Sequence, residues 1–246
     1  MASGTGRLRR LGRPALALLA VAALSGCMEL PAGGIAGGGS GSGPALKQSV
    51  RLSSAGIDVT GPPGYCLDES ASHPSGTGAF AAFRRCEVLR GGSVALSNRA
   101  VLGVSVSDTP NPQPVVAGSE DKLIAYFKTE AGRRVLSRSG KASTVTLLQS
   151  SDRDGVVWLQ VRDTSPTLAL DATYWRAIFD AKGRIVTVTV TGFAEGPLTG
   201  ARARALAEGL VARIRKANSG DATATRADAG ATDADFNGFL RAPPPL

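Results

Sequence analysis

An alternating run near the end of the chain constrains the fold more than any other feature of the sequence. In residues 185–191 an initial isoleucine is followed by three valines that alternate with three threonines. Because successive side chains of a β-strand point to opposite faces of the sheet, the valines are predicted to face the core and the threonines to face water. A strand of this kind is typical of an antiparallel sheet with one face in solvent.

Three more strand-like stretches lie between residues 142 and 192, each rich in β-branched and aromatic residues. The predicted strands are 144–149, 156–162 and 174–179. Turn residues separate them: Asp152–Gly155 lies between the first two, and Asp180–Gly183 precedes the alternating run, with glycine where a hairpin needs positive φ. Together the four stretches predict an antiparallel meander.

The last regular element is predicted to be an amphipathic helix that runs from the N-cap residue Thr199 to about Ala217. Its apolar side chains recur at helical spacing, at Ala203, Leu206, Ala207, Leu210, Val211, Ile214 and Ala217. This apolar stripe is predicted to pack on the valine face of the meander and to close the core.

An earlier helix of about 12 residues is predicted to begin at Ser119, with Glu120 and Asp121 in its first turn, where the helix dipole favours acidic side chains. Gly132 either ends this helix or marks a break before Arg133. The first half of the body is less regular. Residues 49–57 could form a strand or a short helix, and the stretches 64–68, 79–89 and 100–107 read as strands. The predicted class is α+β.

The N-terminus has the pattern of an export signal. Residues 1–13 carry four arginines and no acid, and residues 14–23 carry no charge. Ten helical residues span roughly 15 Å, about half of a hydrocarbon core, so this apolar run is too short for a stable membrane-spanning helix. A charged segment followed by a short apolar segment is typical of a leader that is inserted and then removed.

Leu24-Ser25-Gly26-Cys27 follows directly, and it resembles the lipobox of bacterial lipoproteins. The resemblance implies diacylation of the Cys27 thiol, cleavage before Cys27 and acylation of the new amino group, with palmitate among the expected acyl groups. Two or more acyl chains hold a protein stably on a membrane, whereas one does so only marginally. By analogy with lipoprotein sorting in Gram-negative bacteria, Met28 favours the outer membrane. The alternative is a secretory signal followed by an incidental cysteine.

The chain has three cysteines. If Cys27 carries the lipid, Cys66 and Cys86 remain as an even pair in an oxidising compartment, and a disulfide between them is expected. Such a bond would contribute roughly 3 kcal/mol in the chain-entropy model. The alternative is two buried thiols.

Composition divides the 246 residues into four parts. Residues 1–26 are the expected leader, 27–48 the lipidated cysteine with a Gly/Ser-rich tether, 49–217 one α+β domain, and 218–246 a disordered tail. The formal charge is +8, but without the four leader arginines 24 basic side chains face 20 acidic ones, a net charge of +4. No stretch combines the basic density and aromatics of a nucleic-acid binder, so no nucleic-acid partner is expected.

Two resemblances bear on the body. The order of predicted elements in 119–217 resembles the small curved-sheet domains of the PsbP/Mog1 kind found in some bacterial lipoproteins. The arrangement Gly64-Tyr65-Cys66-Leu67-Asp68 followed by Cys86 resembles uncharacterised envelope proteins of Gram-negative bacteria. Neither resemblance implies an activity.

No group of residues predicts a catalytic site, a metal site or a cofactor. His73, the one histidine, could form a Cys–His pair with a cysteine, but a disulfide explains both cysteines better. Asp152, Asp154 and Asp163 could bind a cation, although aspartate in a hairpin loop is first a turn residue.

Two further sets have ordinary structural explanations. A basic set on the last helix could meet an anionic lipid or a phosphate, but a solvated helix face is expected; it consists of Arg202, Arg204, Arg213, Arg215 and Lys216. Trp158 and Trp175 could line a ligand groove, but packing in the sheet is expected.

These observations predict a non-enzymatic envelope lipoprotein, anchored by its lipid to a membrane that faces the periplasm, that binds or scaffolds another envelope protein. The alternative is a lipoprotein that captures a small ligand in a groove between the last helix and the sheet. A hydrolase whose catalytic residues the sequence does not reveal is the third hypothesis.

Overall fold

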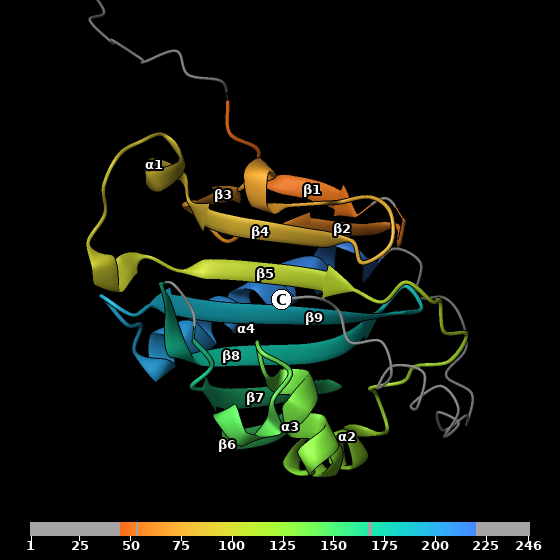
Figure 1. Cartoon of the computed structure of the whole chain (residues 1–246). Helices are drawn as coiled ribbons and strands as arrows, with labels where there is room; N and C mark the ends of the chain where they lie inside the picture. Colours follow the sequence, from red (N-terminus) through yellow and green to blue (C-terminus); the bar gives the residue numbers. More distant parts are fainter. Residues whose placement is uncertain (1–44, 53, 167–168, 220–246) are drawn as a thin grey trace, which may run out of the picture. The chain divides into compact units, whose positions relative to one another are not determined.

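The computed structural model describes residues 45–52, 54–166 and 169–219. A seven-stranded antiparallel sheet in the order β3-β4-β5-β9-β8-β7-β6 forms the centre, and β1 and β2 form a separate pair (Figure 1). The strands are β1 (Ser49–Leu52), β2 (Ile57–Thr60), β3 (Tyr65–Leu67), β4 (Phe80–Arg85), β5 (Val101–Val106), β6 (Val145–Arg153), β7 (Val156–Asp163), β8 (Leu170–Ala181) and β9 (Arg184–Phe193).

The α-helices are α1 (Cys86–Leu89), α2 (Glu120–Lys128), α3 (Glu130–Leu136) and α4 (Gly200–Ala217), and short 3-10 turns cover Glu69–Ala71, Leu96–Asn98 and Ala142–Thr144. Strands in one sheet and helices on its two faces confirm the predicted α+β class. Residues 49–57, for which the sequence left strand and helix open, contain β1 and the start of β2.

The predicted meander is present as β6 to β9, with longer strands and tighter turns than expected. The turns between β6 and β7 and between β8 and β9 reduce to two residues each, and both residues have positive φ. These are Asp154 at 53° with Gly155 at 68°, and Lys182 at 46° with Gly183 at 66°. Such turns match the right-handed twist of the flanking strands, so the hairpins need this conformation at a non-glycine residue as well as at glycine.

The helix α4 packs on the valine face of β9, as predicted (Figure 1). Ala207, Leu210 and Ile214 are fully buried there, whereas Ala217 at the end of the stripe is exposed because the helix ends at that residue. Oγ1 of the N-cap residue Thr199 accepts a hydrogen bond from the backbone N–H of Arg202.

The other face of the sheet is covered by α2 and α3, which lie over β6 and β7 (Figure 1). A second apolar cluster joins these helices to the sheet, and it includes Leu123, Phe127 and Leu136 from the helices with Val157, Leu159 and Ile178 from the strands. The face opposite α4 is therefore not in solvent along β6 to β8, which corrects the expectation of one wet face.

Two helices replace the single one expected after Ser119. The break lies at Thr129, whose ψ of 167° is extended and whose side chain caps α3 by accepting a hydrogen bond from the N–H of Gly132. A Cβ atom on Gly132 would lie 2.1 Å from the carbonyl oxygen of Tyr126. Gly132 is thus inside α3, where it permits the close approach of α2 and α3. Ser119 makes no side-chain cap.

A disulfide joins Cys66 to Cys86 with 4.9 Å between the Cα atoms. Cys66 lies on β3, but Cys86 is the first residue of α1, directly after β4. The expected strand 79–89 therefore ends at Arg85, and the bond connects a strand to a helix rather than two strands.

The expected leader 1–26, Cys27, most of the tether and residues 220–246 lie outside the described residues. The last two residues of the expected tether are tied to the body, because the carbonyls of Lys47 and Gln48 accept hydrogen bonds from the N–H groups of Leu67 and Gly61. Asn218, expected in the tail, is buried and donates to the carbonyl of Asp58. In the part of the chain that the structure describes, no helix is long and apolar enough to cross a membrane.

Candidate ligand site

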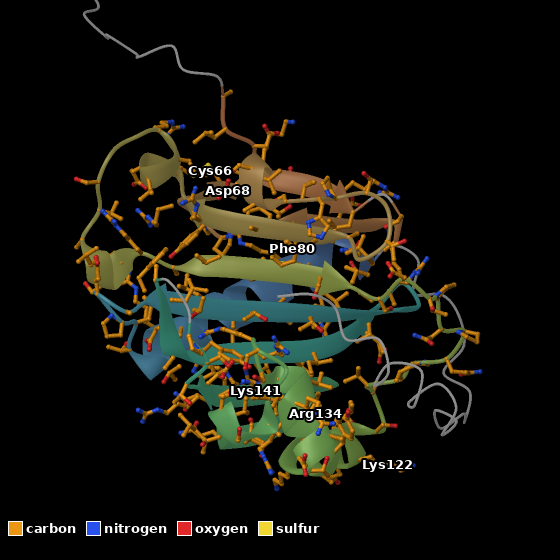
Figure 2. All side chains as sticks on the ribbon, in the orientation of Figure 1. Cys66, Asp68, Phe80, Lys122, Arg134 and Lys141 are labelled. Atoms are coloured by element: carbon orange, nitrogen blue, oxygen red, sulfur yellow. A yellow bond between two sulfur atoms is a disulfide. The ribbon has the colours of Figure 1, made fainter. Side chains whose placement is uncertain are left out.

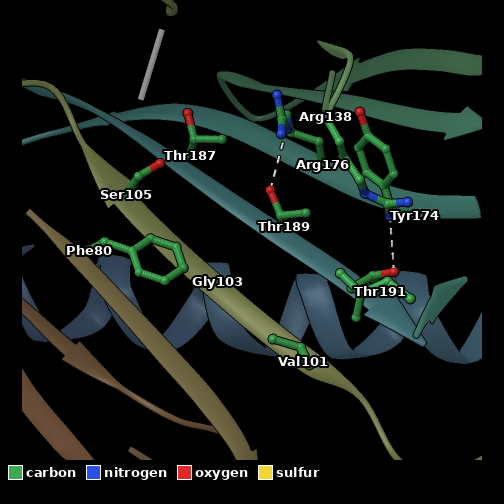
Figure 3. A pocket seen from close by; sticks show the side chains of 11 residues that line it. Phe80, Val101, Gly103, Ser105, Arg138, Tyr174, Arg176, Thr187, Thr189 and Thr191 are labelled. Atoms are coloured by element: carbon green, nitrogen blue, oxygen red, sulfur yellow. Dashed lines mark hydrogen bonds between the residues drawn. The ribbon is translucent and has the colours of Figure 1, made fainter. Parts of the chain in front are cut away.

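A cavity of about 270 Å³ lies on the part of the second sheet face that α2 and α3 leave uncovered (Figure 3). Three adjacent strands form its floor in one continuous register. Gly103 of β5 is paired with Thr189 of β9, and Thr189 is paired in turn with Arg176 of β8. Phe80 of β4 closes one side, and Arg138, which follows α3, closes the other.

The predicted threonine face of β9 lines this cavity. Thr187, Thr189 and Thr191 point away from α4, as the alternation requires. Thr187 and Thr191 are nevertheless only 5% exposed each. The expectation that the threonines face water is therefore wrong for these two residues. Oγ1 of Thr189 accepts a hydrogen bond from Arg176 of β8, and Oγ1 of Thr191 accepts one from Arg138 after α3, so these two hydroxyls are bonded within the protein.

Arg176 is a buried charge at this site. Its side chain comes from the middle of β8, is 5% exposed, and donates from Nε to Oγ1 of Thr189 over 3.3 Å. Its guanidinium carbon lies 5.4 Å from the centroid of the Tyr174 ring. Burying a charged group is costly unless partners compensate it, so a strand position of this kind requires an explanation.

Arg138 lies near the same ring. Its guanidinium carbon lies 5.1 Å from the Tyr174 centroid, and Nη2 donates to the carbonyl of Asp171 over 2.9 Å and to Oγ1 of Thr191 over 3.3 Å. Nη1 is buried and makes no hydrogen bond to the described residues. Burial lowers the pKa of Arg138, the nearby Arg176 lowers it further, and Tyr174 and the acidic neighbours oppose this change.

Asp163 holds the segment that carries Arg138. Its carboxylate is 1% exposed and accepts hydrogen bonds from the backbone N–H of Arg138 over 2.7 Å and from the N–H and Oγ of Ser165 over 2.9 and 2.7 Å. Burial raises the pKa of Asp163, but these hydrogen bonds, with one from Thr144, outweigh burial and lower the pKa overall. Asp163 is therefore an ionised anchor for the loop after α3.

The end of the cavity away from the arginines is apolar. Phe80 of β4 and Val101 of β5 line it, and Gly103 lies beneath the Phe80 ring. A Cβ atom on Gly103 would lie 3.0 Å from that ring, so glycine lets the ring lie across β5. His73 stacks on Phe80 with 5.5 Å between the ring centroids.

The residues that the sequence singled out for catalysis or metal binding do not form a site. Cys66 and Cys86 are bonded to each other, and Figure 2 shows Cys66 at the β3 edge, far from Arg134 on α3. Asp152 and Asp163 stand at opposite ends of the β6–β7 hairpin. No group of three metal-ligating side chains occurs within 45–52, 54–166 and 169–219.

The tryptophans pack in the sheet, as expected. Trp158 and Trp175 are buried on the α4 face, and the guanidinium carbon of Arg204 lies 3.9 Å and 4.7 Å from their ring centroids. The basic set is divided: Arg202, Arg213 and Lys216 are exposed, while Arg204 and Arg215 lie over aromatic rings of the sheet. Core side chains pack between α4 and the sheet, and the cavity described above lies on the other face of the sheet and not between helix and sheet.

Sequence reasoning missed Arg138 and Arg176. A signal existed for Arg176, because it is the only charged residue in the predicted strand 174–179. For Arg138 no comparable signal exists, because it is one of several arginines in a polar stretch and only the fold directs it to the cavity.

No protein-family model matches the chain, and no curated protein matches it. Among solved structures, the chain is similar to PsbP (CyanoP) from the cyanobacterium Synechocystis sp. PCC 6803, with 17% sequence identity and a TM-score of 0.37. The similarity covers 73% of this chain and 98% of the other. At this level the two structures are only distantly alike, and no ligand, partner or activity follows from the likeness.

Proposed function

We propose that the protein is a membrane-anchored binding protein that captures a small ligand in the cavity on the threonine face of β9. The observation that carries this proposal is the cavity itself, with two partly or fully buried arginines at one end and apolar side chains at the other. Concave sites that combine an apolar lining with a few fixed polar groups are the usual form of small-molecule sites.

The cavity favours binding over catalysis. The polar side chains that line it are arginines and hydroxyl groups, with the phenol of Tyr174. Hydrolysis would need a general base near pH 7, usually histidine or a carboxylate, and neither type is among the described residues that line the cavity. The proposed protein therefore holds its ligand without transforming it.

The leader supports the proposed location. An arginine-rich segment, a short apolar segment and the lipobox-like residues ending in Cys27 favour export and attachment to a membrane through acyl chains. Replacing Cys27 with Ala should release the body from membranes or leave an uncleaved precursor. Membrane fractionation and intact-mass analysis test this, and an unchanged, fully processed membrane form would contradict lipid attachment.

A cavity-filling variant tests the binding function. We expect Thr189→Phe to place a ring in the cavity, and Thr146→Phe to be its matched control because Thr146 is an exposed threonine on the edge strand β6. The full chain and both variants are purified without denaturant from the cells that make the protein, and bound small molecules are identified by mass spectrometry. The unmodified chain and Thr146→Phe should carry the same compound, and Thr189→Phe should lack it.

The competing hypothesis of a scaffolding protein predicts a different result. Cross-linking in membranes would then yield one stoichiometric envelope protein, retained equally by Thr189→Phe and Thr146→Phe. That outcome, together with no small molecule on the unmodified chain, would overturn the proposal.

A further inference from the structure

We infer that the ligand is a small organic anion, with its carboxylate or phosphate oxygens held by Arg138 and Arg176 and its short apolar part directed to Phe80 and Val101. This inference rests on the proposed ligand site and names the chemistry that the site recognises.

The first step is the charge at the cavity. No ion pair joins Arg138 or Arg176 to an acidic side chain within the described ranges. Three other partly buried arginines do have such partners: Arg84 with Asp68 at 2.6 Å, Arg85 with Glu87 at 2.9 Å, and Arg204 with Glu208 at 2.9 Å. Among the described residues, Arg138 and Arg176 thus make no direct ion pair with an acidic side chain.

The nearest acids are already engaged. Asp163 accepts from the backbone of Arg138 and from Ser165, and Asp171 accepts from the N–H of Thr173 over 3.1 Å. Both act on Arg138 at longer range and raise its pKa, while burial, the largest effect, lowers it. An anion in the cavity would supply the contact that these carboxylates do not make.

The second step is the geometry of the donors. Both guanidinium groups lie within 5.4 Å of the ring centroid of Tyr174, so they converge on one region (Figure 3). Thr189 and Thr191 hold them from the floor. Nη1 of Arg138 is buried and needs an acceptor. Guanidinium groups bind planar or tetrahedral oxyanions with two parallel hydrogen bonds, so this arrangement suits a carboxylate or a phosphate ester.

The third step is the apolar end. An inorganic ion would leave Phe80 and Val101 without an apolar contact from the ligand. A volume of about 270 Å³ lies just below the range of sites for drug-sized ligands. The site therefore suits an oxyanion head with a short hydrocarbon or single-ring body, and it is too small for a complete two-chain lipid.

The test compares probes that differ only in the head group. The full chain carrying Cys27→Ser, so that no acyl chain competes for the cavity, is titrated by calorimetry with hexanoate, hexyl phosphate, hexanol, hexylamine and inorganic phosphate. We expect hexanoate or hexyl phosphate to bind at least about tenfold more tightly than hexanol, because a hydrogen bond to a charged group is worth this much. Which of the two binds better identifies the head group.

Arginine variants locate the binding. Arg176→Met and Arg138→Met keep the length of the side chain and remove the charge, and each should remove the preference for the anion over hexanol. Arg134→Met is the matched control, because Arg134 is on the exposed surface of α3 with a side chain that is 58% exposed (Figure 2). It should leave every affinity unchanged.

The outcomes separate the inference from the proposed function. Equal affinities for hexanol and hexanoate would overturn the inference and leave an apolar ligand site. Equal affinities for inorganic phosphate and hexyl phosphate would overturn the organic part of it. If no probe binds while Thr189→Phe still loses its natural compound, the anion inference is wrong and the binding function stands. If a methionine variant does not fold, the chain that keeps Arg138 and Arg176 still tests the inference, because its preference for the anions over hexanol is measured directly.

Discussion

The two faces of the seven-stranded sheet are filled in different ways. The face toward α4 is packed by apolar side chains from the helix and from strands β1 to β5 and β7 to β9. The opposite face is packed only where α2 and α3 lie, and beside them it contains a cavity with two arginines. The comparison indicates that one face stabilises the fold and the other carries the polar groups available for function.

The largest expected effect is on the packed face. Leu210→Ala should lower the free energy of unfolding by about 2–5 kcal/mol, because Leu210 is fully buried and the change leaves a cavity in a close-packed core. Denaturant unfolding followed by circular dichroism measures the change. Leu148→Ala is the control, since Leu148 is 46% exposed on the edge strand β6. A loss as small as in the control would show that α4 is not part of the cooperative core.

The disulfide should have the next largest effect. Replacing both Cys66 and Cys86 with Ser should lower the free energy of unfolding by roughly 3 kcal/mol, because the bond closes a loop with a sequence separation of 20. Ligand affinity should not change, since neither cysteine lines the cavity. Parallel unfolding and titration measurements check both statements, and a lost affinity with unchanged stability would place the disulfide in the site.

The stabilisation by Asp163, which holds the loop beside the cavity, should depend on pH. Its pKa is lower in the folded protein than in the unfolded chain, so its stabilisation is complete above the ordinary carboxyl pKa and is lost as the pH falls through the lower folded pKa. Asp163→Asn should lower the free energy of unfolding by about 1–3 kcal/mol at neutral pH, because its NH2 group would replace one of the two oxygens that accept from the N–H groups of Arg138 and Ser165. The loss should be much smaller in acid.

The difference between the Asp163→Asn and unmodified unfolding curves isolates this effect. Burial raises the pKa of Asp180, which gives the opposite pH dependence and is present in both proteins. A stability difference that stays constant from neutral to acidic pH would contradict the role of Asp163 as an ionised anchor.

The smallest effect is expected at the cavity. Arg176→Met should change the free energy of unfolding by less than about 1 kcal/mol or raise it, because it replaces a buried charge that lacks an ion pair with an apolar side chain of similar length. Thermal unfolding without ligand measures this. A loss as large as that of Leu210→Ala would show that Arg176 is structural and would remove the contrast between the two faces.

The strength of each sequence prediction follows the strength of its local pattern. The Val/Thr alternation of β9 and the apolar stripe of α4 predicted two elements and the contact between them, because periods of two and of 3.6 residues leave one solution for the apolar faces. Cys66 and Cys86 were predicted as a pair, and the structure contains that bond. The helix after Ser119 was predicted in place but not in its division, because Gly132 is required by a close approach that no local pattern records.

The candidate site could not be predicted in the same way. The sequence by itself determined an α+β body and the apolar faces of its main strand and helix. Only the tertiary structure decided that the threonine face of β9 is enclosed and that Arg138 joins Arg176 beside Tyr174. The physical reason is distance along the chain: an apolar period acts between neighbouring residues, whereas the cavity is made by side chains from β4, β5, β8, β9 and the loop after α3, which only folding brings together.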